Sequence, residues 1–127
     1  MTRYLFVYGT LKRGQRNAHY LSTSRFVCEA CLAPNYVLRG SEIPYLCPVE
    51  KGTGLHVQGE IYQVEPDVLC AIDQLERHPD WYRREVVPLA EPVCIDGSVV
   101  TEVEAYVMYD DALAALPSYA RYPYQVP

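Results

Sequence analysis

The distribution of apolar and polar residues predicts a chain made mostly of strands. The first pattern is a run of five apolar residues, Tyr4 to Tyr8, that ends at Gly9. A run this short, with aromatic and β-branched members, favours a strand buried on both faces over a helix. Gly9 either adopts a backbone conformation that side chains disfavour or leaves room for a ligand against bare N–H groups. A simple strand-to-turn junction is the plainer interpretation.

Strand-like composition, turn signals and, at 57–64 and 99–109, alternation with a period of two predict the remaining strands, at residues 25–32, 35–39, 57–64, 81–89, 92–95 and 99–109. The segment 57–64 alternates apolar and polar residues, so we expect it to be half-buried. Gly59 within it marks a bulge or a close approach of another chain segment. Asp96-Gly97 predicts a tight hairpin between the last two strands.

Boundary signals place the longest helix at residues 66–77. Pro66 suits the first helical position, and the helix must end before Pro79, because the residue preceding a proline avoids the helical region. Two shorter helices are expected, one over residues 18–21 with Asn17 as its cap and one over about residues 111–116.

One carboxylate of the longest helix falls where an apolar side chain is expected. At about 100° per residue, Glu76 shares an arc with Val68, Leu69, Ile72 and Leu75. Burial raises the pKa of a carboxyl group, which suits a general acid/base working near neutral pH. Alternatively, Glu76 lies in a frayed last turn and forms a solvated salt bridge with Arg77, Arg83 or Arg84. Asp73, one turn earlier, is expected to face the surface.

Aromatic and proline-rich segments complete the pattern. Residues 43–49 hold too many prolines for a central strand and too many apolar side chains for an exposed loop, so they either wall a pocket or cover the core. The chain has twelve tyrosines and two phenylalanines, and buried tyrosine hydroxyls need partners, which favours a polar, aromatic-lined cavity. The tail, with Tyr119, Tyr122 and Tyr124, is expected to wrap around the body.

Composition narrows the function classes. A chain of 127 residues suits one domain, here residues 1–127, and a net charge of −5 without a basic block argues against nucleic acid or an acidic membrane as partner. No apolar segment approaches the roughly 18 residues of a membrane span, so we expect a cytoplasmic protein. The five cysteines are scattered. Cys28 and Cys31 lack the second pair that structural zinc needs, so no metal is expected.

Several of these stretches together resemble one known family. Tyr8-Gly9-Thr10-Leu11 after a buried strand, followed by Lys12-Arg13-Gly14-Gln15, resembles the substrate loop of the gamma-glutamyl cyclotransferase-like superfamily. The same order continues with Ile43-Pro44-Tyr45, Gly59-Glu60-Ile61-Tyr62, Leu69-x-x-Ile72-Asp73-x-x-Glu76 and Tyr82-x-Arg84. The resemblance covers about residues 5–109 and is strongest to the gamma-glutamylaminecyclotransferase branch, through residues 73–84. An ordered set of motifs is far more specific than any one of them.

The resemblance implies an α+β fold, with a small, mixed, barrel-like sheet of five or six strands and a few short helices. It implies that Glu76 is the general acid/base. It also implies that the substrate is held by Tyr8, Gly9, Thr10, Leu11, Ile43, Pro44 and Tyr82.

The implied reaction is an intramolecular acyl transfer on a small gamma-glutamyl molecule. The α-amine attacks the gamma-carbonyl, and 5-oxoproline and an amine are released without a cofactor. The sequence does not identify the leaving amine, which can be the ε-amine of lysine, an alkyl amine, an α-amino acid or an aminoglycoside-like amine. It does not indicate an oligomeric state either. Residues 110–127 do not follow the family pattern.

Two functions from other classes remain open. The chain can be a non-catalytic module that binds a gamma-glutamyl or amino-acid ligand with the same loop. It can also be a scaffold whose tyrosine-rich tail contacts a partner. A glutamate within an apolar arc argues against both alternatives.

Overall fold

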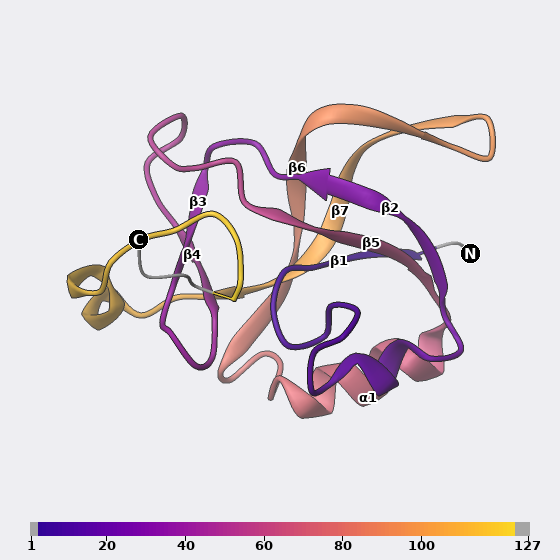
Figure 1. Cartoon of the computed structure of the whole chain (residues 1–127), viewed down its shortest axis with the longest axis horizontal. Coiled ribbons are helices and arrows are strands. Elements are labelled where there is room, and N and C mark those ends of the chain that lie inside the picture. Colours follow the sequence, from indigo (N-terminus) through magenta and orange to yellow (C-terminus); the bar gives the residue numbers. More distant parts are fainter. Residues whose placement is uncertain (1–2, 124–127) are drawn as a thin grey trace.

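The computed structural model describes residues 3–123 and contains a curled five-stranded sheet, a separate two-stranded sheet and one α-helix (Figure 1). The strands are β1 (Arg3–Val7), β2 (Arg25–Cys31), β3 (Tyr36–Arg39), β4 (Tyr45–Pro48), β5 (Gln58–Val64), β6 (Tyr82–Ile95) and β7 (Ser98–Met108). The helical elements are α1 (Pro66–Leu75) and two 3₁₀ helices, η1 (Ala18–Leu21) and η2 (Asp111–Ala115). The expected α+β class is confirmed.

β1 lies at the centre of the larger sheet, whose order is β2-β5-β1-β7-β6. It pairs antiparallel with β5 and parallel with β7. Leu5, Phe6 and Val7 are at most 2% exposed, as a strand covered on both faces requires. The strand that was expected to be buried is therefore the central strand of the sheet, and Gly9 lies just beyond its last residue, Val7.

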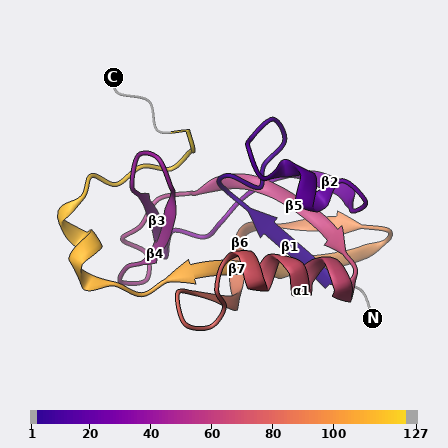
Figure 2. The same cartoon turned by 90° about the horizontal axis from the view of Figure 1, so that it is seen from below.

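Two apolar clusters occupy the two faces of this sheet. Leu5 and Val7 point to the face covered by α1, where they join Leu69 and Ile72. Figure 2 shows α1 lying across β1 on this face. Phe6 packs on the opposite face, with side chains of β5, β6 and β7 and of the two-stranded sheet. Successive residues of a strand point to opposite faces, so β1 contributes to both clusters.

The β3–β4 hairpin and the C-terminal segment lie together at one end of the molecule (Figures 1 and 2). Tyr119 and Leu38 exchange backbone hydrogen bonds of 2.9 Å in each direction, and Tyr119 and Tyr122 are at most 9% exposed. The expectation that the tail wraps around the body is thus confirmed for these two residues. Tyr124 lies outside the described residues.

β5 is more buried than its alternating sequence predicts. Both its neighbours, β1 and β2, are paired along its length, and Glu60 is only 7% exposed. The close approach expected at Gly59 is confirmed, because a β-carbon there would collide with the Val7 carbonyl and the Phe6 ring.

Two boundary expectations are wrong. α1 ends at Leu75, two residues before the expected end, so Glu76 is its C-cap. Asn17 makes no side-chain hydrogen bond to the helix that it precedes and donates instead to the Thr10 hydroxyl at 3.1 Å. The strands expected at 81–89 and 92–95 form one long strand, β6, with an irregularity between Pro88 and Val93.

Candidate active site

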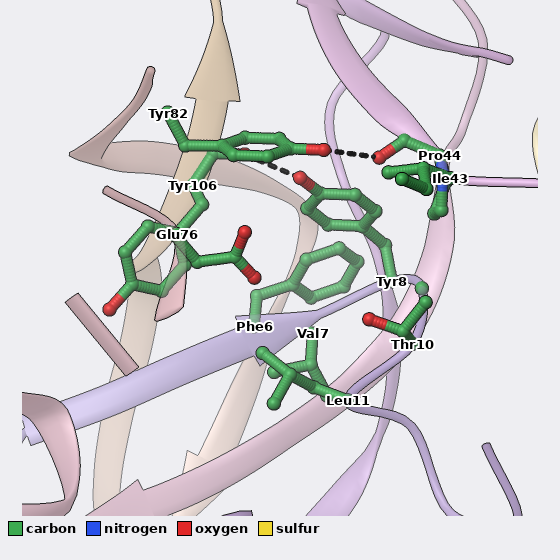
Figure 3. Close-up of a pocket in the computed structure, with 11 residues that line it drawn as sticks. Phe6, Val7, Tyr8, Thr10, Leu11, Ile43, Pro44, Glu76, Tyr82 and Tyr106 are labelled. Carbon is green, nitrogen blue, oxygen red and sulfur yellow. Dashed lines mark hydrogen bonds between the residues drawn. The ribbon is translucent and has the colours of Figure 1, made fainter. Parts of the chain in front are cut away.

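A pocket of about 40 Å³ opens at the end of β1, between the loop that follows it, the tip of the β3–β4 hairpin and the end of α1 (Figure 3). It is lined by Phe6, Val7, Tyr8, Gly9, Thr10, Leu11, Ile43, Pro44, Glu76, Tyr82 and Tyr106. All eight site residues expected from the sequence are among them. The roles assigned to these residues remain predictions.

The two loops that wall the pocket are in direct contact. A side chain at Gly9 would collide with the ring of Pro44, so glycine at this position allows the β1 loop to approach the hairpin tip. Tyr82 fixes the same tip, because its hydroxyl donates a hydrogen bond of 2.9 Å to the Pro44 carbonyl. The Tyr82 ring therefore lines the pocket while its hydroxyl secures the opposite wall.

The β1 loop exposes several backbone donors. The Lys12 N–H bonds the Gly9 carbonyl at 3.0 Å, and the Asn17 N–H bonds the Thr10 carbonyl at 2.9 Å. In the part of the chain that the structure describes, no protein acceptor takes a hydrogen bond from the N–H groups of Gly9, Thr10 or Leu11. Consecutive free N–H groups of this kind form a site for an anionic oxygen.

Glu76 points its carboxyl group into the pocket, beside Phe6 and below Tyr82 in Figure 3. Burial raises the pKa of this carboxyl group from 4.5 to about 7. Its position at the negative end of α1 acts in the same direction. Among residues 3–123, no hydrogen bond or ion pair engages its oxygens, so they remain available to a ligand.

Two expectations about the carboxylates of α1 are wrong: the salt bridge of Glu76 and the surface position of Asp73. Arg84, which could have paired with Glu76, binds both oxygens of Asp73 at 2.8 and 2.9 Å and also contacts Glu104 at 2.6 Å. Asp73 is therefore held in a network and does not face the surface. Because Asp73 is one turn from Glu76, it takes the nearby cation and leaves Glu76 without one.

The tyrosine hydroxyls around the pocket are all engaged by protein acceptors. Tyr8 donates to the Tyr106 carbonyl at 2.6 Å, and the Tyr106 hydroxyl donates to Asp73 at 2.7 Å. Burial raises the pKa of Tyr8 and of Tyr82 well above the ordinary range, so both stay neutral. Glu76 is the lining residue whose titration falls near neutral pH.

Sequence reasoning missed Tyr106, Phe6 and Val7 as lining residues. Phe6 and Val7 lie in the apolar run before Gly9, where burial was expected and exposure to a cavity was not. Tyr106 lies on the face of β7 that carries Glu104. That mixed face, with a tyrosine between charged and apolar residues, was the available signal.

Within residues 3–123, no group of three His, Cys, Asp or Glu side chains is placed to hold a metal ion. Over the same range, no helix is long and apolar enough to cross a lipid bilayer.

Comparison with known proteins shows which family this chain is similar to. The sequence profile described as "Gamma-glutamyl cyclotransferase, AIG2-like" matches residues 5–124. A protein of Methanocaldococcus jannaschii with a provisional gamma-glutamylcyclotransferase name is 36% identical over 107 residues, which are 84% of this chain and 82% of that protein.

Animal proteins are similar over a smaller share of their own length. Gamma-glutamylaminecyclotransferase B of Danio rerio is 37% identical over 113 residues, which are 83% of this chain and 57% of the fish protein. The chain thus spans little more than half of that relative. The crystal structure of an AIG2-like protein from Mus musculus superposes with a TM-score of 0.81 at 30% identity, over 95% of this chain and 88% of the mouse chain. The profile match alone covers nearly all of the sequence, and the chain belongs to the gamma-glutamyl cyclotransferase, AIG2-like family.

Proposed function

We propose that this protein is a gamma-glutamyl cyclotransferase that converts a small gamma-glutamyl amine to 5-oxoproline and a free amine. The observation that carries the proposal is Glu76, a carboxyl group that has no partner among residues 3–123, lies in the pocket and has a pKa of about 7. At that pKa the group is present both as a base and as an acid near neutral pH.

The free N–H groups of Gly9, Thr10 and Leu11 would bind an anionic oxygen of the substrate. Two candidates are its α-carboxylate and the oxyanion that forms at the gamma-carbon during the reaction. Donors aimed at an oxygen whose charge increases during the reaction stabilise the transition state more than the ground state. A rigid loop suits this purpose, because its donors need no rearrangement.

The reaction begins when the Glu76 carboxylate removes a proton from the substrate's α-ammonium group. The freed amine attacks the gamma-carbonyl carbon, the new C–N bond closes the ring, and the carbonyl electrons move to oxygen. The protonated Glu76 then donates to the departing nitrogen, the carbonyl reforms and the old C–N bond breaks. The second proton on the ring nitrogen returns through Glu76 to the amine, which leaves as an ammonium ion.

This reaction needs no nucleophile from the protein, because the substrate carries its own. The amine and the carbonyl belong to one molecule, so the reaction avoids the entropic cost of bringing two reactants together, on the order of 7–11 kcal/mol in favourable cases. The pocket has to hold the folded conformer in which the amine lies near the gamma-carbon. The apolar walls formed by Phe6, Leu11 and Ile43 support this role.

An amine is proposed as the leaving group because relatives in Danio rerio and Rattus norvegicus are named gamma-glutamylaminecyclotransferases. The apolar character of the hairpin tip at Ile43, which is 37% exposed beside the pocket, is compatible with an alkyl chain. Gamma-glutamyl amino acids are the competing substrates in the test below.

The test measures release of 5-oxoproline from a panel of gamma-glutamyl amines and gamma-glutamyl amino acids, by the native chain and by Glu76→Gln. Positioned acid/base catalysis contributes about 10²–10⁴-fold, so we expect kcat to fall by that factor while the variant stays folded, with a melting temperature no lower than that of the native chain. Glu65→Gln is the matched control, because Glu65 is an exposed glutamate next to the same helix.

Equal turnover by Glu76→Gln and the native chain would contradict the assigned role. No release from any substrate, together with binding of 5-oxoproline seen by calorimetry, would make the protein a non-catalytic binding module.

A further inference from the structure

The chain ends in a segment that bridges both walls of the pocket. Residues 118–123, here called the C-terminal strap, cross the end of the molecule that carries the β3–β4 hairpin (Figure 1). The strap has no helix or strand of its own. Tyr119 and Tyr122 point inward and are buried, whereas Arg121 and Pro123 are exposed.

The first wall held by the strap is the hairpin tip. The Tyr119 hydroxyl donates to the Gly40 carbonyl, and the Tyr122 hydroxyl donates to the Glu42 carbonyl at 3.0 Å. Glu42 directly precedes Ile43, and Gly40 lies three positions before it; Ile43 and Pro44 line the pocket. Gly40 has a positive φ of 91°, so the chain turns sharply here. The two tyrosine hydroxyls donate hydrogen bonds to backbone carbonyls of this turn, which would otherwise need another donor.

The second wall is the β1 loop. The Lys12 ammonium group donates a hydrogen bond of 2.6 Å to the Tyr122 carbonyl, and Lys12 directly follows the lining residue Leu11. Burial lowers the pKa of Lys12, and the nearby Arg121 acts in the same direction. Among residues 3–123 the ammonium group forms no ion pair with a carboxylate, and a charged donor of this kind makes a strong, directional bond to a carbonyl oxygen.

Tyr122 therefore bonds to both walls at once, through its hydroxyl to one and through its carbonyl to the other. The strap is also fixed to the sheet, because the Gln58 N–H at the start of β5 bonds the Ala120 carbonyl at 2.8 Å. These contacts join three segments that are far apart in the sequence. They set the separation between the N–H groups of the β1 loop and the hairpin tip.

We propose that Tyr122, assisted by Tyr119, is a positioning residue that holds the two walls of the substrate pocket at their working distance. This inference rests on the proposed cyclotransferase function. Neither tyrosine is among the lining residues, so both act through Lys12 and the hairpin tip. Loss of the Tyr122 hydroxyl removes one of the three tyrosine hydrogen bonds that hold the hairpin tip and leaves Glu76 unchanged.

The test compares Tyr122→Phe and the double variant Tyr119→Phe/Tyr122→Phe with the native chain. Phenylalanine keeps the ring in the core and removes only the hydroxyl. A hydrogen bond of this kind changes an equilibrium by about fivefold. We expect KM to rise about fivefold for Tyr122→Phe and further for the double variant, with kcat within about twofold and an unchanged pH profile.

Tyr109→Phe is the matched control. Tyr109 is 52% exposed, its hydroxyl donates to Glu85, and it is outside the pocket and the strap. We expect its KM to equal that of the native chain. Lys12→Met removes the bond to the other wall, and we expect it to raise KM as Tyr122→Phe does.

Hydrogen exchange provides a readout that does not depend on turnover. If the strap positions the walls, the hydrogen-bonded amides of Lys12 and Arg13 and those of the β3–β4 ladder exchange faster in Tyr122→Phe, while the β6–β7 hairpin exchanges as before. A lower melting temperature with unchanged KM and unchanged local exchange would mean that the strap only stabilises the fold, and would overturn the proposal.

The two proposals fail in different ways. If the native chain releases no 5-oxoproline, the cyclotransferase assignment fails, and exchange together with 5-oxoproline binding still tests the strap. If the native chain is active and both tyrosine variants match it in KM and exchange, the strap proposal alone is wrong.

Discussion

Glu76 is held in the fold at a cost to stability. The surrounding pocket disfavours its charged form, and no described cation compensates for that charge. In the unfolded chain the same carboxyl group ionises freely at its ordinary pKa. The residue that serves the proposed reaction therefore opposes folding once it is ionised.

This conflict predicts a pH-dependent stability difference. The pKa of Glu76 is raised from 4.5 to about 7, so between these values the unfolded chain gives up a proton that the folded chain keeps. Stability is lost as the pH rises across this interval, by about 3 kcal/mol at most. We expect Glu76→Gln to unfold at higher denaturant concentration than the native chain at pH 8, and at a similar concentration at pH 4.5.

Urea unfolding at several pH values measures this difference, with Glu65→Gln as the control that should show none. The same pKa sets the acidic limb of the rate profile. In the proposed reaction the Glu76 carboxylate accepts the first proton, so kcat/KM should fall as the pH drops below about 7. A stability difference that does not vary with pH would refute the raised pKa.

At the scale of elements, one charged network joins the helix to three strands. Arg3 of β1 binds both oxygens of Glu104 of β7 at 2.7 Å. Glu104 also binds Arg84 of β6, which in turn binds Asp73 of α1 at 2.8 and 2.9 Å. Cations and carboxylates alternate along this chain of contacts, and no member of it is more than 35% exposed. The network fixes the end of α1, and so Glu76, against the sheet.

We predict that Asp73→Asn lowers the free energy of unfolding at pH 7 by about 2 kcal/mol, because it leaves the partly buried Arg84 with one carboxylate. Burial opposes ionisation of Asp73, but hydrogen bonds from Arg84 and Tyr106 outweigh it and lower its pKa below 3.8. The contribution of this carboxylate is present above pH 3.8 and is lost as the pH falls through its lowered pKa.

Denaturant unfolding of both chains at pH 7 and pH 3 measures the effect. Asp96→Asn is the control, because Asp96 makes an equally bidentate pair with Arg25 but both side chains are more than half exposed. We expect a much smaller change there. Equal destabilisation by the two substitutions would mean that burial of the network contributes nothing.

At the scale of the whole molecule, the two apolar clusters share β1 and cannot separate while that strand remains paired. Leu5 belongs to one cluster and Phe6 to the other. The strap adds a second connection, because Tyr119 and Tyr122 belong to the cluster opposite α1. We therefore propose that the chain folds as one domain with one cooperative transition.

Trp81, the single tryptophan, offers a test near the site, since its ring lies 5.3 Å from that of Tyr82. We predict that Trp81 fluorescence and far-ultraviolet circular dichroism report the same unfolding midpoint. Saturating 5-oxoproline, at one hundred times its Kd, should raise the free energy of unfolding by about 2.7 kcal/mol as measured by either signal. A fluorescence transition that precedes the loss of secondary structure would show that the site unfolds separately from the sheet.

Local patterns were enough to predict most of the elements. The apolar run before Gly9, the Pro66 start of the helix and the Asp96-Gly97 turn each depend on neighbouring residues, and each is found where expected. Glu76 was recognised for the same reason, because helical periodicity places it among apolar side chains. The order of the family motifs then located the pocket residues.

The electrostatic environment of the site depends on residues that are distant in sequence. Arg3 and Glu104 are 101 positions apart, and no local pattern indicates that they pair. Asp73 was misplaced for this reason, since its partner Arg84 approaches only after β6 returns beside α1. The partner of each Tyr122 group, Lys12 or Glu42, is likewise chosen by folding. Periodicity decides which side of an element is buried, but only tertiary packing decides which charges and hydroxyl groups meet there.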